Sequence, residues 1–298
     1  MADITLLDGS IGQEIVNRSE DRATPLWSTA VMMEKPEIVA DVHLDYFKSG
    51  ATIATTNTYA LHRDRLKPVK LEDQFDLLLD NAMSMAEQAR HSCGSGRIAL
   101  SLGPLVASYQ PETCPAPEIA ESLYREIISK LAGRADIIVA ETMSSLRQAE
   151  GALRAMQGSG KLNWVALTVD DFDGAKLRSG ESLCDMQSLV DLYQPDAVLI
   201  NCSRPEAVAT ALEIIREFEK PFGAYANGFT MITKEFLVKS PTIDALHERD
   251  DLDPDAYADF AMGWVELGAT IIGGCCEIGP GHIAEIARRL EASGHSIC

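Results

Sequence analysis

The sequence predicts an α/β fold, and within that class a (β/α)8 TIM barrel that forms a single domain over residues 1–298. Short runs of apolar, β-branched residues recur eight times along the chain, and amphipathic stretches of helical periodicity separate them. Most of the runs are apolar throughout, which is typical of parallel strands buried on both faces. Eight strand-and-helix units in 298 residues match a closed barrel. A doubly wound open sheet is the alternative. It ranks second because eight strands and eight helices are the numbers that a closed barrel has.

The strands are expected where the apolar runs lie. Residues 137–140, which read Ile-Ile-Val-Ala, are a representative run. In chain order the expected strands cover 4–8, 51–57, 97–103, 136–142, 163–169, 197–202, 221–227 and 269–276.

Helices are expected between these strands. Over 71–90 the apolar residues recur on one stripe at helical spacing. Pro36 stands where a helix beginning near residue 35 would have its first turn, a position that favours proline. Gly50 and Gly268 each follow a helical stretch and precede a strand, as C-terminal caps do.

The longer connections all follow a strand, so a barrel would place them together at one end, where barrel enzymes carry their chemistry. They cover 61–69, 104–117, 170–183 and 228–254.

The charge and the cysteine content exclude several classes of protein. Lys and Arg number 26 and Asp and Glu 45, which gives 26 − 45 = −19, so we expect neither nucleic acid nor an anionic membrane as a partner. The N-terminus has no export signal, and no apolar run approaches the ~18 residues of a membrane span. Seven cysteines, an odd number, then favour reduced thiols and a cytoplasmic location. Whether the chain forms a homo-oligomer stays open.

Two carboxylates stand out at the ends of expected strands. Asp8 ends the first strand and Glu141 ends the fourth. An apolar strand has no structural need for a terminal carboxylate, so both are candidates for a site. The alternative for each is an N-cap of the next helix or a salt bridge, which is about as frequent.

Three cysteines form the sharpest set. Cys202 ends the sixth expected strand, and Cys275 and Cys276 end the eighth, after Gly273-Gly274. In a barrel these strands flank the seventh, so the three thiols could converge, and three thiolates with one vacant position suit a catalytic zinc ion. A vicinal disulfide between Cys275 and Cys276 is the redox alternative. The remaining cysteines are interpreted as small buried hydrophobes: Cys93, Cys114, Cys184 and Cys298.

Other site signatures are absent from the sequence. The six histidines have no zinc-protease or His-x-His spacing, and His295 is expected in a frayed C-terminus. No Gly-x-Ser-x-Gly elbow and no nucleotide-binding glycine pattern occurs, so a nucleotide cofactor is not expected.

At these residues the chain resembles the homocysteine S-methyltransferase family, which includes the S-methylmethionine-dependent and betaine-dependent enzymes and the homocysteine domain of cobalamin-dependent methionine synthase. The Asn-Cys and Gly-Gly-Cys-Cys motifs are highly specific, and the other matches are individually weak. The loops 109–117 and 228–254 match no branch of the family. The matching motifs are Leu6-Leu7-Asp8-Gly9, Leu26-Trp27-Ser28, Val42-His43-Leu44-Asp45-Tyr46, Gly50-Ala51, Thr56-Asn57-Thr58-Tyr59, Gly103-Pro104, Ala140-Glu141-Thr142, Asn201-Cys202 and Gly273-Gly274-Cys275-Cys276.

The resemblance implies roles for individual residues. It implies that Cys202, Cys275 and Cys276 hold one zinc ion per chain. Asp8 and Glu141 would bind the amino group of homocysteine, and Trp27 would lie near the methyl donor. The remaining substrate-site residues that it implies are Gly9, Thr55, Asn57, Tyr59 and Asn227, of which Tyr59 and Asn227 also fall where relatives supply a fourth zinc ligand.

The resemblance also implies an activity. The chain would transfer a methyl group from a small cationic donor, of the S-methylmethionine, S-adenosylmethionine or betaine type, to the zinc-bound thiolate of homocysteine, giving methionine. No cobalamin module is expected. The alternatives are methylation of another thiol or selenol acceptor, demethylation of a different onium compound, and a non-catalytic zinc-binding thiol sensor.

Overall fold

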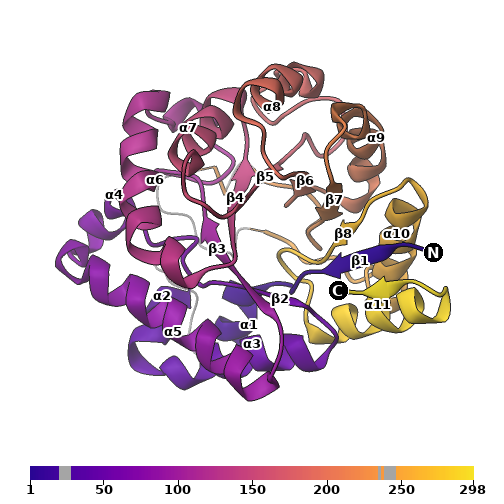
Figure 1. Cartoon of the computed structure of the whole chain (residues 1–298), viewed down its shortest axis with the longest axis horizontal. Helices are drawn as coiled ribbons and strands as arrows, with labels where there is room; N and C mark the ends of the chain where they lie inside the picture. The colour runs from indigo at the N-terminus through magenta and orange to yellow at the C-terminus, as the bar shows by residue number, and fades with distance from the viewer. Residues whose placement is uncertain (20–27, 234–235, 238–245) are drawn as a thin grey trace.

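Nine parallel strands form one sheet that curls into a barrel (Figure 1). The computed structural model describes residues 1–19, 28–233, 236–237 and 246–298. Neighbouring strands follow the order β2-β3-β4-β5-β6-β7-β8-β1-β9. The strands are β1 (Asp3–Leu6), β2 (Ile53–Thr55), β3 (Arg97–Leu102), β4 (Ile137–Met143), β5 (Leu162–Leu167), β6 (Ala197–Asn201), β7 (Phe222–Tyr225), β8 (Ile271–Ile272) and β9 (Ser296–Ile297).

The barrel closes between β1 and β2. Just before β2 begins, the backbone N–H of Thr52 donates a hydrogen bond to the carbonyl of Leu6, with an N···O distance of 2.7 Å. Because β1 also pairs with β8, this contact joins the two ends of the strand order into a closed ring, whereas an open doubly wound sheet would leave two free edges. The barrel predicted from the sequence is therefore confirmed, and the open-sheet alternative is wrong.

Helices surround the strands (Figure 1). Each of the first eight strands is followed by an outer helix, from α3 after β1 to α11 after β8. No helix in the described part of the chain is both long and apolar enough to cross a membrane. The helices are α1 (Ile11–Ser19), α2 (Ser28–Glu34), α3 (Pro36–Lys48), α4 (Arg63–Leu66), α5 (Phe75–Cys93), α6 (Pro117–Leu131), α7 (Leu146–Met156), α8 (Gln187–Tyr193), α9 (Pro205–Ile215), α10 (Pro254–Glu266) and α11 (Pro280–Ala292).

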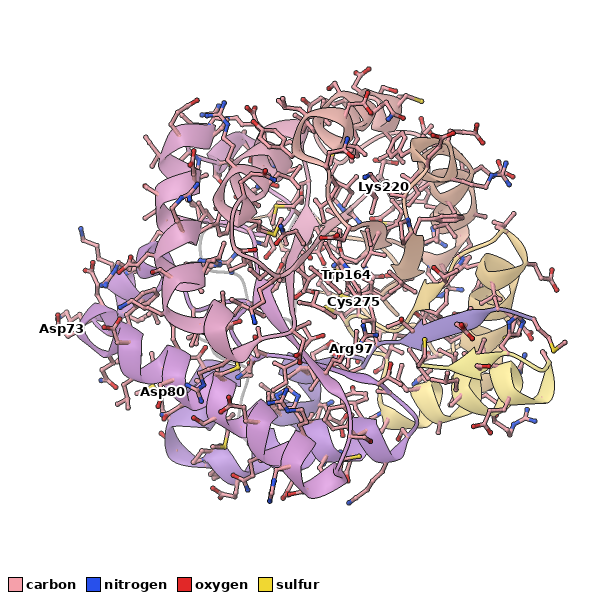
Figure 2. All side chains as sticks on the ribbon, in the orientation of Figure 1. Asp73, Asp80, Arg97, Trp164, Lys220 and Cys275 are labelled. Atoms are coloured by element: carbon pink, nitrogen blue, oxygen red, sulfur yellow. The ribbon has the colours of Figure 1, made fainter. Side chains whose placement is uncertain are left out.

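The apolar strands face two different cores, because successive side chains on a strand point to opposite faces. In β4, Ile137 and Val139 belong to a cluster built from strand residues at the centre of the barrel. Their neighbours Ile138 and Ala140 belong to the larger cluster that the strands share with the helices. Figure 2 shows Trp164 of the inner cluster near the centre of the molecule. Burial on both faces explains why the strands lack polar alternation.

The predicted helix signals appear where expected. Pro36 is the first residue of α3. Gly50 and Gly268 adopt left-handed backbone conformations, with φ of 103° and 101°, directly after the caps of α3 and α10. The predicted helix 71–90 begins later, at Phe75, because a 3-10 turn precedes it.

The two ends of the chain differ from the sequence prediction. The eighth strand was predicted over 269–276 but comprises only Ile271–Ile272, since its polar and glycine-rich end leaves the sheet to build a turn. The C-terminus is not frayed at 296–297, where β9 pairs with β1. Beyond it, the Cys298 backbone N–H donates to the Ile4 carbonyl at 2.9 Å. A two-residue strand is too short to produce a periodic pattern.

Gly223 in β7 allows a close contact between neighbouring strands. A Cβ atom at this position would lie 1.8 Å from the Ile271 carbonyl oxygen of β8. We expect Gly223→Ala to lower the free energy of unfolding by about 1–3 kcal/mol, because backbone must move to relieve the clash. Urea denaturation measures this change. Gly133→Ala is the matched control, because its Cβ would meet no atom within 4 Å, and an equal loss in both variants would contradict the explanation.

Candidate active site

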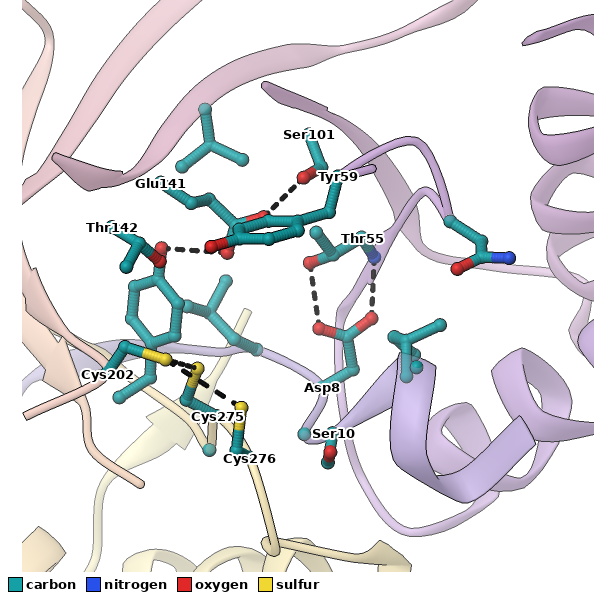
Figure 3. Close-up of a pocket in the computed structure, with 18 of the residues that line it drawn as sticks. Asp8, Ser10, Thr55, Tyr59, Ser101, Glu141, Thr142, Cys202, Cys275 and Cys276 are labelled. Atoms are coloured by element: carbon teal, nitrogen blue, oxygen red, sulfur yellow. Dashed lines mark hydrogen bonds between the residues drawn. The ribbon is translucent and has the colours of Figure 1, made fainter. Parts of the chain in front are cut away.

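A cavity of about 120 Å³ lies at the carboxyl ends of the strands. Its walls come from the segments after β1, β2, β3, β6 and β8 and from the ends of β4 and β7. Figure 3 shows carboxyl, hydroxyl and sulfur-bearing side chains around this space. The cavity therefore occupies the end of the barrel where the sequence predicts the site.

Three cysteine side chains from two strand ends meet in the cavity. The Sγ atom of Cys202 lies 2.7 Å from Sγ of Cys275 and 3.8 Å from Sγ of Cys276. All three sulfur atoms lie within 4.8 Å of one another, a compact group that could hold a metal ion. The convergence predicted from the chain order is thus present in the structure. A trio of thiolates matches the ligand preference of Zn²⁺.

The four remaining cysteines differ in burial, and of these only Cys114 is buried. The prediction that they are small buried hydrophobes is therefore wrong for Cys93, Cys184 and Cys298, which are exposed.

The three thiols share their protons unequally. Hydrogen bonds from Cys275 and Cys276 hold the pKa of Cys202 well below its ordinary value, and the hydroxyl of Tyr109 and the charge of Arg178 act in the same direction. The same bonds with Cys202 raise the pKa of Cys275 and of Cys276. Cys202 is therefore the sulfur best stabilised as a thiolate, which is the form that binds metals.

Gly273 and Gly274 allow β8 to approach β1 closely. A Cβ on Gly273 would lie 2.5 Å from Cβ of Leu7, and one on Gly274 would lie 2.2 Å from Cγ2 of Ile278. Neither glycine has a positive φ, so a close approach, and not a left-handed turn, explains their presence. The turn itself uses Glu277, which has a φ of 65°.

Asp8 reaches across to β2 from the end of β1. Its carboxylate accepts hydrogen bonds from the backbone N–H and the hydroxyl of Thr55, at 2.5 and 2.8 Å. Burial raises the pKa of Asp8 to about 7, against the opposing effect of the Thr55 hydrogen bonds. Asp8 neither caps α1 nor forms an ion pair with any described residue, so the structural alternatives considered for it are wrong.

Glu141 occupies the corresponding position on β4. Its carboxylate accepts hydrogen bonds from the hydroxyls of Ser101 and Tyr225, the latter at 3.1 Å. Burial raises the pKa of Glu141 to about 7. Like Asp8, it has no cationic partner among the described residues, so the cavity holds two buried carboxyl groups without a counter-charge.

The segment after β2 lines the same cavity. The Oδ1 atom of Asn57 accepts a hydrogen bond of 2.6 Å from the hydroxyl of Ser28. The hydroxyl of Tyr59 lies 2.8 Å from that of Ser108. Gly9 is in contact with the turn after β8, where a Cβ would lie 2.0 Å from the Ile278 carbonyl oxygen.

Two residues of the expected site are not placed in the cavity. Asn227 is buried after β7, but it is not among the residues that line the cavity. Its Oδ1 accepts from the backbone N–H of Phe229 at 3.2 Å, and its Nδ2 has no partner in the described part of the chain. Trp27 lies outside the described residues.

The sequence analysis missed three residues of the site. The hydroxyl of Tyr109 donates to Sγ of Cys202 at 3.0 Å. Asn201 makes paired hydrogen bonds with Thr142, at 2.9 and 3.1 Å, which join the ends of β4 and β6. Ser101, the hydroxyl on Glu141, interrupts the apolar strand β3, and this could have identified it. No pattern in the sequence points to Tyr109.

The barrel gathers three thiols and two carboxyl groups around one cavity, and the described residues place no cation beside those carboxyl groups. This combination is typical of a metal-dependent enzyme that binds a small substrate with an amino group. Comparisons with known proteins identify the family. The family model described as Homocysteine S-methyltransferase matches residues 5–290. The chain belongs to the homocysteine S-methyltransferase family, which is a family of enzymes.

Individual relatives match over nearly their whole length. The homocysteine S-methyltransferase of Escherichia coli (strain K12) is 28% identical, with 96% of this chain and 95% of the relative aligned. Homocysteine S-methyltransferase YbgG of Bacillus subtilis (strain 168) is 27% identical over 95% of this chain and 93% of its own. The crystal structure of the metallated form of the E. coli homocysteine methyltransferase MmuM superposes with a TM-score of 0.81, at 26% identity and 96% coverage of both chains.

The two buried carboxyl groups predict a specific pH dependence of stability. Both have a pKa of about 7 in the folded protein, compared with about 4 in an unfolded chain. Between these values the folded state binds more protons than the unfolded state, so the free energy of unfolding should fall as the pH rises. Urea denaturation of the metal-free protein from about pH 5 to pH 7 measures this slope.

Removing either carboxyl group should flatten that slope. We therefore expect Asp8→Asn and Glu141→Gln to lose less stability over the window than the unmodified protein does. Glu213→Gln, a change of an exposed residue on α9, serves as the control and should keep the slope. Identical slopes in all four proteins would contradict the assignment.

Proposed function

We propose that this protein transfers a methyl group from a small onium compound to the sulfur of homocysteine and so forms methionine, with one zinc ion held by Cys202, Cys275 and Cys276. The observation that carries the proposal is the presence, in one cavity, of three sulfur atoms within 4.8 Å and of two buried carboxyl groups that have no counter-charge in the described part of the chain. Membership of the homocysteine S-methyltransferase family agrees with both features.

Cys202, Cys275 and Cys276 would hold the metal that activates the homocysteine sulfur as the nucleophile. When bound, zinc with its three thiolate ligands would take the homocysteine sulfur as its fourth ligand and favour the deprotonated form, which a free thiol with a pKa near 8.5 seldom adopts at neutral pH. The donor set fits this ion, since three cysteine sulfurs lie within 4.8 Å of one another and zinc favours thiolate ligands.

The carboxyl groups orient the amino acid. We assign the ammonium group of homocysteine to Asp8 and Glu141, because it provides the positive charge that both lack. Its arrival should lower their raised pKa values, so that both bind it as carboxylates. Thr55 on one side and Ser101 on the other hold these carboxylates in place.

The donor is an onium compound on chemical grounds. A sulfonium or quaternary ammonium group leaves as a neutral molecule, and its charge disappears as the thiolate attacks. A cavity that excludes water assists such a reaction, because neither partner keeps its full hydration. Holding sulfur, methyl carbon and leaving atom in line can contribute up to about 7–11 kcal/mol. We place the donor beside Tyr59, whose ring could contribute about 0.5–2 kcal/mol of cation–π attraction. A role of Trp27 in donor binding stays a prediction from the sequence, since that residue lies outside the described part of the chain.

A non-catalytic thiol sensor is the weaker reading. A sensor needs only the three sulfurs, and it would not require the buried carboxyl groups of Asp8 and Glu141. Another thiol or selenol amino acid would satisfy the same groups, so the acceptor is tested along with the donor.

Zinc analysis tests the metal centre. We expect about one zinc per chain in protein purified under reducing conditions, and its loss in Cys202→Ala and in Cys276→Ala, because a site with three protein ligands does not readily lose one. Mass spectrometry of the metal content measures this. Cys93→Ala, which changes an exposed cysteine on α5, should keep the zinc. Reduced protein without zinc would refute the proposal.

Methionine formation tests the reaction. Homocysteine is offered with S-methylmethionine, S-adenosylmethionine or betaine, and the product is quantified by chromatography. Glu141→Gln should raise the KM for homocysteine about 10- to 100-fold while zinc is retained, since a hydrogen bond to a charged group is worth about 1.5–3 kcal/mol.

The outcomes of the screen differ clearly. Methylation of selenohomocysteine but not of homocysteine would favour the selenol alternative. If no donor methylates any acceptor while the protein contains zinc, the proposed activity is wrong. An unchanged KM in Glu141→Gln would remove Glu141 from the substrate site.

A further inference from the structure

The Cys202 sulfur has a hydrogen-bond partner that the other two sulfurs lack. The hydroxyl of Tyr109 donates to Sγ of Cys202 at 3.0 Å. Over the described residues, Sγ of Cys275 and Sγ of Cys276 have no hydrogen-bond partner other than a cysteine thiol. The three sulfurs are therefore not equivalent.

Tyr109 is held in place independently of any substrate. It is buried and adopts a left-handed backbone conformation, with φ of 60°. Phe236 packs edge-on against its ring, with the centroids 5.8 Å apart. The guanidinium carbon of Arg178 lies 4.9 Å from the ring centroid. These contacts aim the hydroxyl at Cys202.

Arg178 also secures the backbone of Cys202. Its guanidinium donates to the Cys202 carbonyl at 3.3 Å, and the hydroxyl of Thr168 donates to the same oxygen at 3.1 Å. A nearly buried ion pair with Asp171, at 2.7 Å, fixes the guanidinium. The loops after β3 and β5 thus hold both the sulfur and the carbonyl of Cys202.

The negative charge of the metal-bound sulfurs explains why a hydrogen-bond donor to Cys202 is useful. A divalent ion with three cysteine thiolates and a substrate thiolate carries a formal charge of 2 − 4 = −2. The ion pair with Asp171 partly offsets the charge of Arg178, so hydrogen-bond donors are needed to stabilise the remaining excess. A methyl donor could also attack any of the four sulfurs, and methylation of a cysteine would destroy the site.

We propose that Tyr109 is a positioning residue that withdraws electron density from the Cys202 thiolate through its hydroxyl, and so protects this ligand from methylation. A thiolate that accepts a hydrogen bond is a weaker electron donor and a weaker nucleophile. At neutral pH a phenol remains protonated and donates this bond. The proposal rests on the metal site proposed above, but it does not depend on which donor or acceptor the enzyme uses.

The first experiment uses cobalt-substituted protein. Co²⁺ replaces zinc, and the thiolate-to-cobalt charge-transfer absorption reports the electron density on the sulfurs. Tyr109→Phe keeps the ring between Phe236 and Arg178 but removes the hydroxyl, so the band should move to longer wavelength. Tyr124→Phe removes a buried hydroxyl that donates to the Gly103 carbonyl and does not line the cavity, so it should leave the band in place. An unmoved band in Tyr109→Phe would overturn the proposal.

The second experiment measures the nucleophilicity of Cys202 directly. Zinc-loaded protein without homocysteine is treated with iodomethane, whose methyl group bonds to the sulfur as iodide leaves. Mass spectrometry of the peptide that contains Cys202 gives the rate of methylation. We expect the rate to rise roughly tenfold in Tyr109→Phe, the factor expected for the loss of one hydrogen bond to a charged group. Equal rates in both proteins would overturn the proposal.

A strengthened hydrogen bond provides the opposite test. Replacing Tyr109 with 3-fluorotyrosine makes the phenol more acidic while the ring contacts remain. The cobalt band should then move to shorter wavelength and the methylation of Cys202 should slow down. This variant also decides the case if Tyr109→Phe fails to fold, since a band and a rate equal to those of the unmodified protein would overturn the proposal. A negative donor screen would leave these results unaffected.

Discussion

The site depends on backbone contact between the ends of β1 and β8. The Ser10 N–H donates to the Ile278 carbonyl at 2.9 Å, and the Gly274 N–H donates to the Asp8 carbonyl at 3.0 Å. Glycine at position 9 is required for this contact, because any Cβ there would overlap the Ile278 carbonyl. This contact brings the carboxyl group from the first strand and the two cysteines from the last strand into the same cavity.

The cavity collects acidic groups and few basic ones. Asp8, Glu141 and three thiols line it, and burial keeps both carboxyl groups protonated up to about pH 7. Such a site favours cationic ligands, because each one relieves the cost of a buried negative charge. A divalent metal, an ammonium group and an onium donor all satisfy this requirement. The electrostatics of the cavity thus suit the ligands of the proposed reaction.

Properties that repeat along the chain could be predicted, whereas properties of single contacts could not. The eight barrel strands follow from apolar runs, and the meeting of Cys202 with Cys275 and Cys276 follows from the order of strands in a barrel. The role of Tyr109 depends on a loop whose left-handed turn leaves no periodic signal. Strand β9 comprises two residues and was missed for the same reason. The assignment of individual residues to homocysteine and its donor stays a prediction.

The pairing of β1 also has a consequence for biosynthesis. Besides β2, which closes the barrel against it, its neighbours are β8 and β9, which follow it by more than 260 residues. During translation β1 is made more than 260 residues before β8 and β9, so these two pairings can form only long after β1 has left the ribosome. Closing so long a loop is entropically costly, so the pairing of β1 with β8 and β9 should be among the last parts of the molecule to form. During that interval the strand edge of β1 that later pairs with β8 is unpaired, and the nascent chain would benefit from a chaperone that protects it.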